Sequence, residues 1–216
     1  MNKIFLDLET TGLNWKEDKI IEICCLKKTD FDNKEYIFHY YLNPGNIKIS
    51  KGAYLIHGIK DIFLKNKPYF KNIINKFIFF IRNSKIIIHN TNFDLKFLNN
   101  ELKKNNFKNL NYYCYKIIDT LKISKKMYTN KKNSLKILCK RFGINDSKRI
   151  KHGALIDCRL LEEVFINLWI IKNKIEYKIN IIRKKYYFKN NNLVLKANPY
   201  NIKFNKFLIN YINLLK

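Results

Sequence analysis

Four carboxylates and one imidazole stand at positions where their chemistry would be complementary. Asp7 and Glu9 end a short apolar run, and Asp94, His152 and Asp157 follow much further along the chain. Carboxylates in this number can hold two divalent metal ions, which activate a water molecule against a phosphodiester. An imidazole is a side chain suited to take the proton from that water.

Asp7 and Glu9 are two residues apart on a predicted strand, so both side chains point to one face of the sheet and can share a metal ion. Alone, this pattern is more typical of two solvated carboxylates at the end of a strand. The tight turn at residues 10–13 adds weight, because its amides and hydroxyls could receive the end of a nucleic-acid chain.

Asp94, His152 and Asp157 carry little information singly, but they complete the set. Asp94 is expected near the start of a helix, where its charge suits the helix dipole even without a function. His152 stands in a loop just before a predicted helix, with Asp157 in the early turns of that helix. The flexible Gly153 would let the imidazole reach a water molecule bound to the metal that Asp157 holds. Together with Asp7 and Glu9 on the first strand, these three residues form a pattern that is specific for the two-metal chemistry described above.

The elements that must position these residues indicate an α/β fold. Strands are predicted at residues 3–8, 20–26, 36–42, 86–89 and 115–118. Helices are predicted at residues 72–82, 93–103, 134–142 and 153 to about 172. Asp119 and Thr120 are expected to cap a further helix. Three strands in sequence followed by alternating helices and strands predict a mixed five-stranded sheet, an antiparallel meander plus parallel strands, flanked by helices.

The chemistry-bearing residues all fall within residues 1–172, which we expect to form one catalytic domain. Residues 173–192 are rich in Lys and Asn with little periodicity, which is typical of a basic linker. Residues 193–216 form a short C-terminal tail with apolar residues at helical spacing. That stripe fits either a core helix or a docking helix for a partner.

The charge balance favours a polyanionic partner. The chain of 216 residues carries 43 Lys and Arg against 17 Asp and Glu, a net charge of +26. Such a balance makes nucleic acid the natural partner. However, the abundance of Lys, Asn, Ile, Tyr and Phe and the absence of Gln are typical of an AT-rich genome. The charge therefore supports nucleic-acid binding only modestly.

The cysteines and the hydropathy favour a cytoplasmic protein. The five cysteines are odd in number and form no C-x-x-C pair, which predicts buried reduced thiols rather than disulfides or a zinc site. Asp7 and Glu9 interrupt the N-terminal apolar run, and no apolar run is long enough to span a bilayer. We expect neither a signal peptide nor a membrane partner.

These motifs resemble those of a known family, the DEDD-type 3'-5' exonucleases, in the subclass named for its histidine. The first motif of that family matches Asp7 and Glu9, the second Asp94, and the third His152 and Asp157. The match is closest to the proofreading epsilon subunits of bacterial DNA polymerase III. Further matching segments lie, in order, at residues 19–23, 41–44, 56–59, 133–135 and 145–149. The resemblance covers roughly residues 3–170, with a weaker likeness over 193–216.

The resemblance implies a ribonuclease H-like fold and removal of mismatched 3'-terminal nucleotides as nucleoside 5'-monophosphates. Two Mg²⁺ or Mn²⁺ ions would bind in each active site. Asp7, Glu9 and Asp157 would be the principal metal ligands, Asp94 would hold the second ion partly through water, and His152 would be the general base. The same three principal ligands would also lie against the substrate.

Other residues are candidates for binding the 3' end of the DNA. By the resemblance, Thr10 and Leu13 would touch the terminal nucleotide, and His57 would approach that nucleotide or its phosphate. Phe93 could stack on a base, although an aromatic residue at this place in a helix is more often part of the core. For His57, a structural loop histidine is nearly as good an interpretation.

The implied partners are a single-stranded or frayed 3' DNA end and the catalytic alpha subunit of the polymerase, bound through residues 193–216. A small theta-like subunit is a further candidate partner. Family members often bind the sliding clamp through a glutamine-led motif, and a chain without Gln lacks that motif in its usual form. Near Gly52, the family often has an acidic substrate contact that glycine cannot supply.

Two other functions remain open on the sequence alone. An exonuclease acting on RNA 3' ends would use the same acidic residues. A non-catalytic subunit that stabilises the polymerase would keep the fold without the chemistry, although retention of all five catalytic positions in so biased a chain argues against it.

Overall fold

The structure of the chain is a computed structural model. It describes residues 1–29, 34–147, 149 and 151–191, with side chains as far as Lys174. Residues 1–172 form one compact unit, and residues 173–216 are grouped as a second. The first unit contains the sheet and every candidate site residue.

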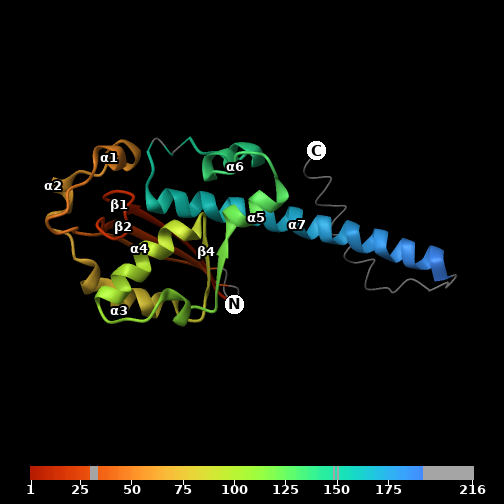
Figure 1. The fold of residues 1–216 in the computed structure, drawn as a ribbon, viewed down its shortest axis with the longest axis horizontal. Coiled ribbons are helices and arrows are strands. Elements are labelled where there is room, and N and C mark those ends of the chain that lie inside the picture. The colour runs from red at the N-terminus through yellow and green to blue at the C-terminus, as the bar shows by residue number, and fades with distance from the viewer. Residues whose placement is uncertain (30–33, 148, 150, 192–216) are drawn as a thin grey trace. The chain divides into compact units, whose positions relative to one another are not determined.

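A mixed sheet lies at the centre of this unit (Figure 1). Its strands are β1 (Lys3–Thr10), β2 (Ile20–Lys28), β3 (Glu35–Tyr41), β4 (Lys85–Ile88) and β5 (Lys116–Asp119). The spatial order is β3-β2-β1-β4-β5 in a five-stranded sheet. The first three strands pair antiparallel, whereas β1, β4 and β5 pair parallel. The predicted combination of a meander and parallel strands is therefore confirmed.

Helices connect and cover these strands. They are α1 (Lys51–His57), α2 (Asp61–Leu64), α3 (Phe70–Ile81), α4 (Thr91–Lys104), α5 (Thr120–Met127), α6 (Leu135–Phe142) and α7 (Ala154–Asn191). Local signals explain several ends. The Asp119 side chain accepts hydrogen bonds from the first amides of α5, as expected. Gly143 ends α6 in the left-handed conformation, where glycine carries no steric cost.

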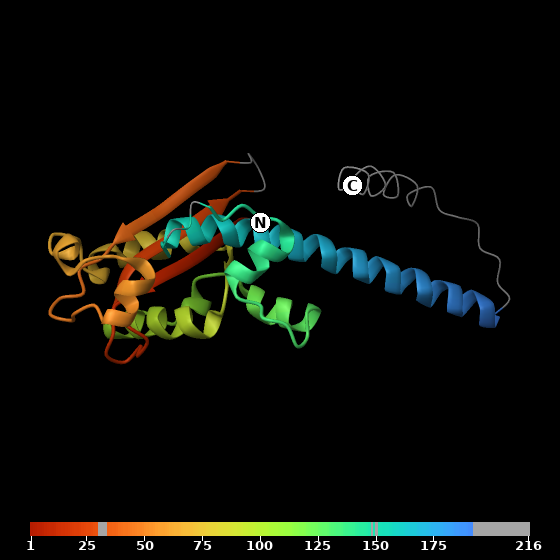
Figure 2. The same cartoon turned by 90° about the horizontal axis from the view of Figure 1, so that it is seen from above.

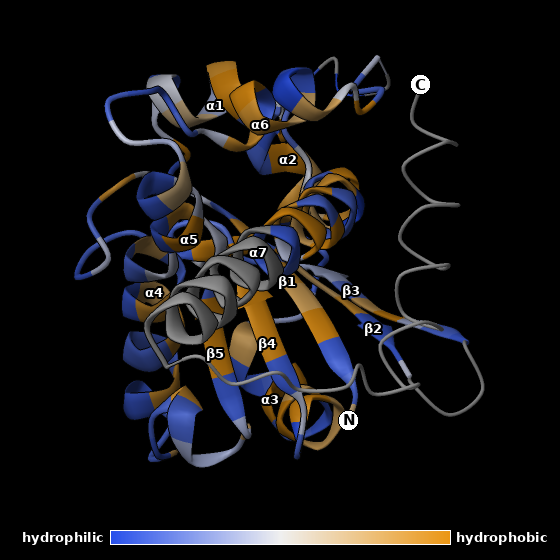
Figure 3. Cartoon of the chain, turned by 90° about the vertical axis from the view of Figure 1, so that its right-hand side faces the viewer, coloured by the Kyte–Doolittle hydropathy of each residue, from blue (hydrophilic) through white to orange (hydrophobic). Residues whose placement is uncertain are grey.

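Side-chain alternation along β1 divides the core between the two faces of the sheet. Ile4, Leu6 and Leu8 pack in a cluster with α3 and α4, whereas Phe5 packs in a second cluster with α6 and α7. Figure 1 shows the sheet between these two sets of helices, Figure 2 shows α7 passing over the strands, and Figure 3 shows apolar residues along the strands. Successive side chains on a strand point to opposite faces, so Asp7 lies on the same face as Phe5, the face that α7 covers.

The expected end of the last long helix at about residue 172 is wrong. α7 continues to Asn191 and so runs through most of the segment interpreted as a linker, 173–192. Between Gly153 and Pro199 the sequence contains neither glycine nor proline, and Lys is a good helix former, so nothing in the backbone stops the helix. The weak apolar periodicity of residues 173–192 therefore does not mean that the helix ends before them. The predicted polymerase-binding tail, 193–216, lies outside the described residues.

The cysteines are free thiols, as the sequence predicts. Cys24, Cys25, Cys139 and Cys158 are buried, and Cys114 is partly buried. Among the described residues, no helix combines the length and hydrophobicity of a membrane-spanning segment.

Candidate active site

The end of β1 carries two of the candidate carboxylates. Asp7 is partly buried and Glu9 is 8% exposed, both on the face of the central strand that α7 covers. The pairing with β2 shifts register between Glu9 and Thr10, so the strand bends just after the pair. The Thr10 hydroxyl then donates to the Gly12 carbonyl at 2.6 Å, which closes the turn. Burial and pairing thus fix both carboxylates on the central strand, towards its C-terminal end.

The third carboxylate comes from the first turn of α4. Asn90, just before the helix, has a left-handed backbone with φ of 75°, a conformation that Asn tolerates. The Asp119 carboxylate accepts from the Thr91 amide at 3.2 Å and from the Thr91 hydroxyl at 2.8 Å. One residue at the end of β5 therefore caps α4 as well as α5. Asp94, 4% exposed, is held by this arrangement near the positive end of the helix dipole.

His152 lies in the loop just before α7, and Asp157 lies in the first turn of α7. The His152 amide donates to the Ile56 carbonyl at 3.2 Å, which ties the loop before α7 to α1, and the Asp157 amide donates to the Gly153 carbonyl in the first turn. The Asp157 side chain is 4% exposed and that of His152 is 46% exposed. Their Nδ1 and Oδ2 atoms are 3.4 Å apart. The pair therefore combines a fixed buried carboxylate with an accessible imidazole.

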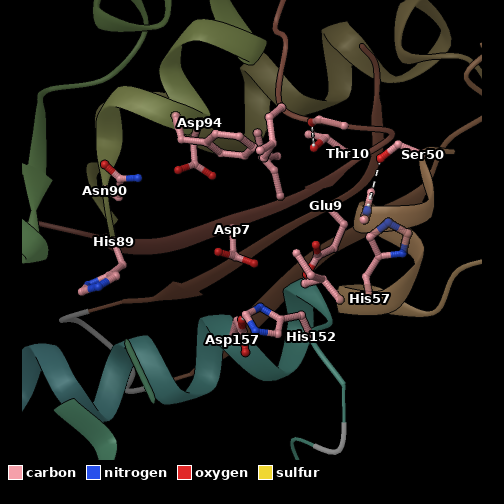
Figure 4. A pocket seen from close by; sticks show the side chains of 17 residues that line it. Asp7, Glu9, Thr10, Ser50, His57, His89, Asn90, Asp94, His152 and Asp157 are labelled. Carbon is pink, nitrogen blue, oxygen red and sulfur yellow. Dashed lines mark hydrogen bonds and ion pairs between the residues drawn. The ribbon is translucent and has the colours of Figure 1, made fainter. Parts of the chain in front are cut away.

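These residues line one pocket of about 380 Å³. Figure 4 shows Asp7 and Glu9 between Asp94 on one side and His152 with Asp157 on the other. All nine residues predicted for the site line this pocket: Asp7, Glu9, Thr10, Leu13, His57, Phe93, Asp94, His152 and Asp157. Side chains separated by 150 positions in the sequence thus meet in a single cleft.

The same pocket offers contacts for a larger ligand. His57 is 7% exposed, and its Nδ1 accepts from the Ile59 amide at 3.0 Å. Its Nε2 is buried and has no hydrogen-bond partner among the described residues. Leu13, 81% exposed, lies at the pocket edge. Phe93 lines the pocket but also packs on Phe97, with ring centroids 4.9 Å apart, so it belongs partly to the core.

The sequence interpretation missed several pocket residues, among them Ser50 and Asn90. Ser50 caps α1 by accepting from the Ala53 amide at 3.2 Å, and a Ser before a helix is a recognisable signal. That helix was not predicted, so the signal went unused. Arg149, which contacts two of the candidate catalytic residues, also went unassigned. Its loop offered no signal of secondary structure.

Comparison with known proteins decides the family. The family model described as Exonuclease matches residues 4–165. The DNA polymerase III subunit epsilon of Buchnera aphidicola from Acyrthosiphon pisum is 40% identical over 204 residues, covering 88% of this chain and 85% of that protein. The epsilon subunit of Escherichia coli K12 is 39% identical over 171 residues, covering 76% and 70%. That of Rickettsia prowazekii is 43% identical over 172 residues, covering 78% and 74%.

The chain belongs to the exonuclease family of DNA polymerase III epsilon subunits. Solved structures support the fold of this epsilon-family chain. Exonuclease X in complex with 5' overhanging duplex DNA aligns with a TM-score of 0.59 at 22% identity, covering 79% of this chain and 93% of that one. E. coli exonuclease I in complex with a dT13 oligonucleotide aligns with a TM-score of 0.67 at 17% identity, covering 84% and 43%.

These matches confirm the predicted family, the ribonuclease H-like fold and the predicted exonuclease activity. The roles of the individual site residues in this epsilon-family chain stay predictions. Their electrostatics show what the pocket is built to bind.

Like charges crowd the pocket. Burial raises the pKa of Asp7 well above its ordinary value, and the nearby carboxylates of Asp157, Asp94, Glu9 and Glu22 raise it further. Burial, followed by the charge of Glu22, raises the pKa of Glu9 from 4.5 to about 8. Burial also raises the pKa of Asp94. Such groups are unfavourable as isolated anions, and a bound cation relieves both the burial cost and the repulsion.

Asp157 is the exception within the pocket. Burial alone would raise its pKa, but the nearby His152 and the paired guanidinium of Arg149 outweigh burial and lower it below its ordinary value. Asp157 is therefore an anion at neutral pH, with its charge paired to the Arg149 guanidinium.

The donor atoms fit a divalent metal ion. Glu9, His152 and Asp157 each offer one ligand atom, and these atoms all lie within 4.8 Å of one another. Carboxylate oxygens are the ligands that Mg²⁺ prefers, and Mn²⁺ also accepts an imidazole nitrogen. This epsilon-family chain therefore contains an acidic cluster suited to the divalent metals on which exonucleases of its family generally depend.

The raised pKa of Glu9 predicts how stability depends on pH. Between pH values of about 4.5 and about 8, the folded chain keeps a proton on Glu9 that the unfolded chain has lost, so stability falls as pH rises. We expect the thermal midpoint of EDTA-treated protein to fall across this range, with a smaller fall in Glu9→Gln. Glu163→Gln, an exposed change on α7, is the matched control. Equal pH slopes in all three proteins would contradict this explanation.

Proposed function

We propose that this chain is the proofreading 3'-5' DNA exonuclease subunit of a DNA polymerase III, releasing nucleoside 5'-monophosphates with two Mg²⁺ or Mn²⁺ ions. The observation that carries the proposal is the single pocket lined by Asp7, Glu9, Asp94, His152 and Asp157. The epsilon names of the relatives support the replication role.

In this proposal, Asp7, Glu9 and Asp157 hold the metal ions, and Asp94 completes the site for the second ion. When bound, the two ions would lower the pKa of the attacking water and stabilise the leaving 3'-oxygen. The carboxylates themselves take no proton from the water. Their burial keeps bulk water from screening the charges that form during hydrolysis.

His152 would be the general base. It stands 46% exposed at the mouth of the pocket, so its ring can turn towards the attacking water while Asp157 stays fixed. A histidine takes a proton efficiently near neutral pH. The proximity of His152 to Glu9 and Asp157 also fits direct metal ligation. The two roles predict different metal affinities for a His152→Ala variant.

Other residues of the pocket would bind the 3'-terminal nucleotide. The buried Nε2 of His57, for which no hydrogen-bond partner is found among the described residues, could bond to the nucleotide or its phosphate. Thr10 and Leu13 would contact the sugar and base, and Phe93 would stack on a base. Mismatched ends would be preferred because unpairing costs less there than at a matched end.

The proposal also assigns regions of the chain. Residues 1–172 would be the exonuclease domain, and residues 193–216 would bind the polymerase alpha subunit beyond the linker region at 173–192. A theta-like subunit remains a further candidate partner, and the lack of Gln argues against the usual clamp motif. Work on the bacterial chromosome would assign the protein to the cytoplasm.

A substrate comparison tests the proposal. With Mg²⁺, we expect nucleoside 5'-monophosphate release from a 3'-mismatched DNA primer to be at least about tenfold faster than from a ribo-oligonucleotide of the same sequence, and faster than from a matched primer. Preference for the ribo-oligonucleotide would favour an RNA 3'-end exonuclease. No release from any substrate would favour a non-catalytic subunit that stabilises the polymerase.

A further inference from the structure

Arg149 contacts both Asp157 and His152 within the candidate site. Its Nε donates to Oδ1 of Asp157 at 2.5 Å, and its Nη2 donates to Oδ2 at 2.6 Å. The same Nη2 lies 2.9 Å from Nδ1 of His152. The Arg149 side chain is only 7% exposed and that of Asp157 only 4%. The guanidinium therefore binds one candidate metal ligand through both oxygens and reaches the candidate base as well.

The loop holds Arg149 at this place. The Arg149 amide donates to the Asp146 carbonyl at 2.9 Å, and the His152 amide donates to Ile56. Both ends of the short segment that carries the guanidinium are thus anchored. The pKa of Arg149 is raised: burial would lower it, but the hydrogen bond and charge of Asp157 outweigh burial. The side chain is a permanent cation in any case.

Arg149 and a divalent ion require the same atoms. A bidentate guanidinium engages both oxygens of a carboxylate, and a metal ion at Asp157 needs at least one of those oxygens. Two cations so close together also repel each other. Binding of a metal ion at Asp157 therefore has to loosen or break the pair of hydrogen bonds from Arg149 to Asp157.

The contact with His152 leads to the same conclusion. A guanidinium can only donate hydrogen bonds, so Nδ1 of His152 accepts from Arg149, and the neutral ring carries its proton on Nε2. In this arrangement the one lone pair with which the neutral imidazole could accept a proton, on Nδ1, is already engaged by Arg149. His152 can accept a proton from water only after Arg149 has withdrawn or the ring has turned.

We propose that Arg149 is an exchangeable counter-cation, which holds Asp157 and His152 in position until a divalent metal ion takes its place at Asp157. The exchange frees the carboxylate and the imidazole lone pair in one movement. It also keeps a buried carboxylate paired at all times, since an unpaired buried charge is strongly destabilising. The inference rests on the proposed function, because it requires a divalent ion at Asp157.

Calorimetric titration with Mn²⁺ alone tests the exchange through binding rather than activity. We expect Arg149→Gln to bind Mn²⁺ about tenfold or more tightly than the unsubstituted chain, because the ion no longer has to displace a guanidinium from Asp157. Arg159→Gln is the matched control: it also removes one positive charge, and Arg159 is on α7, where its Nη2 pairs with Glu35 at 2.9 Å. Arg159→Gln is expected to leave Mn²⁺ affinity unchanged within about twofold.

Thermal unfolding gives a second readout. With EDTA, Arg149→Gln should melt below the unsubstituted chain, and Mn²⁺ should raise its melting point by more than it raises that of the unsubstituted chain. Equal or weaker Mn²⁺ binding by Arg149→Gln, compared with Arg159→Gln, would overturn the exchange and assign Arg149 a purely structural role at Asp157.

A measurement on the unsubstituted chain keeps the inference testable even if Arg149→Gln fails to fold. The Arg149 Nε–H signal in nuclear magnetic resonance should move towards that of a free guanidinium as Mg²⁺ is added. A signal unmoved at saturating Mg²⁺ would overturn the exchange. Absence of any divalent binding to the unsubstituted chain would contradict the proposed function, and the exchange with it.

Discussion

Asp7→Asn and Asp157→Asn are each expected to lower nucleoside 5'-monophosphate release from a 3'-mismatched primer by at least about 10³-fold. Loss of several kcal/mol of metal-supplied stabilisation corresponds to this range. Both side chains line the pocket, Asp157 with 4% exposure. The substitution keeps the size of each side chain and removes its charge. The initial rate of monophosphate release at saturating Mg²⁺ measures the effect.

The two substitutions are expected to differ in stability, which separates loss of chemistry from loss of fold. Burial and like charges raise the pKa of Asp7, so Asp7→Asn should keep or raise the thermal midpoint of EDTA-treated protein. Asp157 is paired with Arg149, so Asp157→Asn should lower it. Glu163→Gln, on the exposed side of α7, is the control for both. An Asp7→Asn variant that is stable and fully active would rule out Asp7 as a metal ligand.

His152→Ala is expected to slow hydrolysis by about 10²- to 10⁴-fold, the range for loss of a general base. If His152 is a base and not a ligand, the Mn²⁺ dissociation constant should change by no more than about threefold. A His39→Ala variant is a suitable comparison, because His39 bonds to Glu22 at 2.7 Å and does not line the pocket.

The outcome for His152 separates two chemical roles. A slow variant with normal Mn²⁺ affinity would support proton transfer by His152. A large loss of affinity would assign His152 to the metal shell, as its closeness to Glu9 and Asp157 also permits. An unchanged rate of hydrolysis would rule out a catalytic role for His152.

The sequence predicted the sheet well because its strands are short apolar runs with clear boundaries. Ile4, Leu6 and Leu8 alternate with polar or opposite-facing positions along β1, and that period places Asp7 and Glu9 on one face. The residues of the pocket were predicted through the spacing of motifs and a family resemblance. Apolar periodicity alone could not have predicted the pocket residues. Asp94, His152 and Asp157 each stand at or near the start of a helix, where single residues of these types are common without any catalytic role.

Other features depend on tertiary contacts that no local pattern contains. The two hydrogen bonds between Arg149 and Asp157 join a loop to a helix across eight positions. The resemblance covers residues 145–149, but no local pattern there distinguishes Arg149 from the neighbouring Lys148 as the partner of Asp157. α1 and α2 are short, with 7 and 4 residues, too short for helical periodicity to show. The extent of α7 was missed because a helix is ended by its backbone breakers, and the first proline after Gly153 is Pro199.

Four carboxylates from three separate elements are proposed to hold a pair of divalent ions in one pocket. A crystal structure of the protein with Mn²⁺ and a nucleoside 5'-monophosphate, recorded with anomalous scattering from manganese, tests this arrangement directly. Two manganese peaks are expected among Asp7, Glu9, Asp94 and Asp157, with the phosphate against them. Manganese absent from this pocket, or bound only elsewhere, would contradict it.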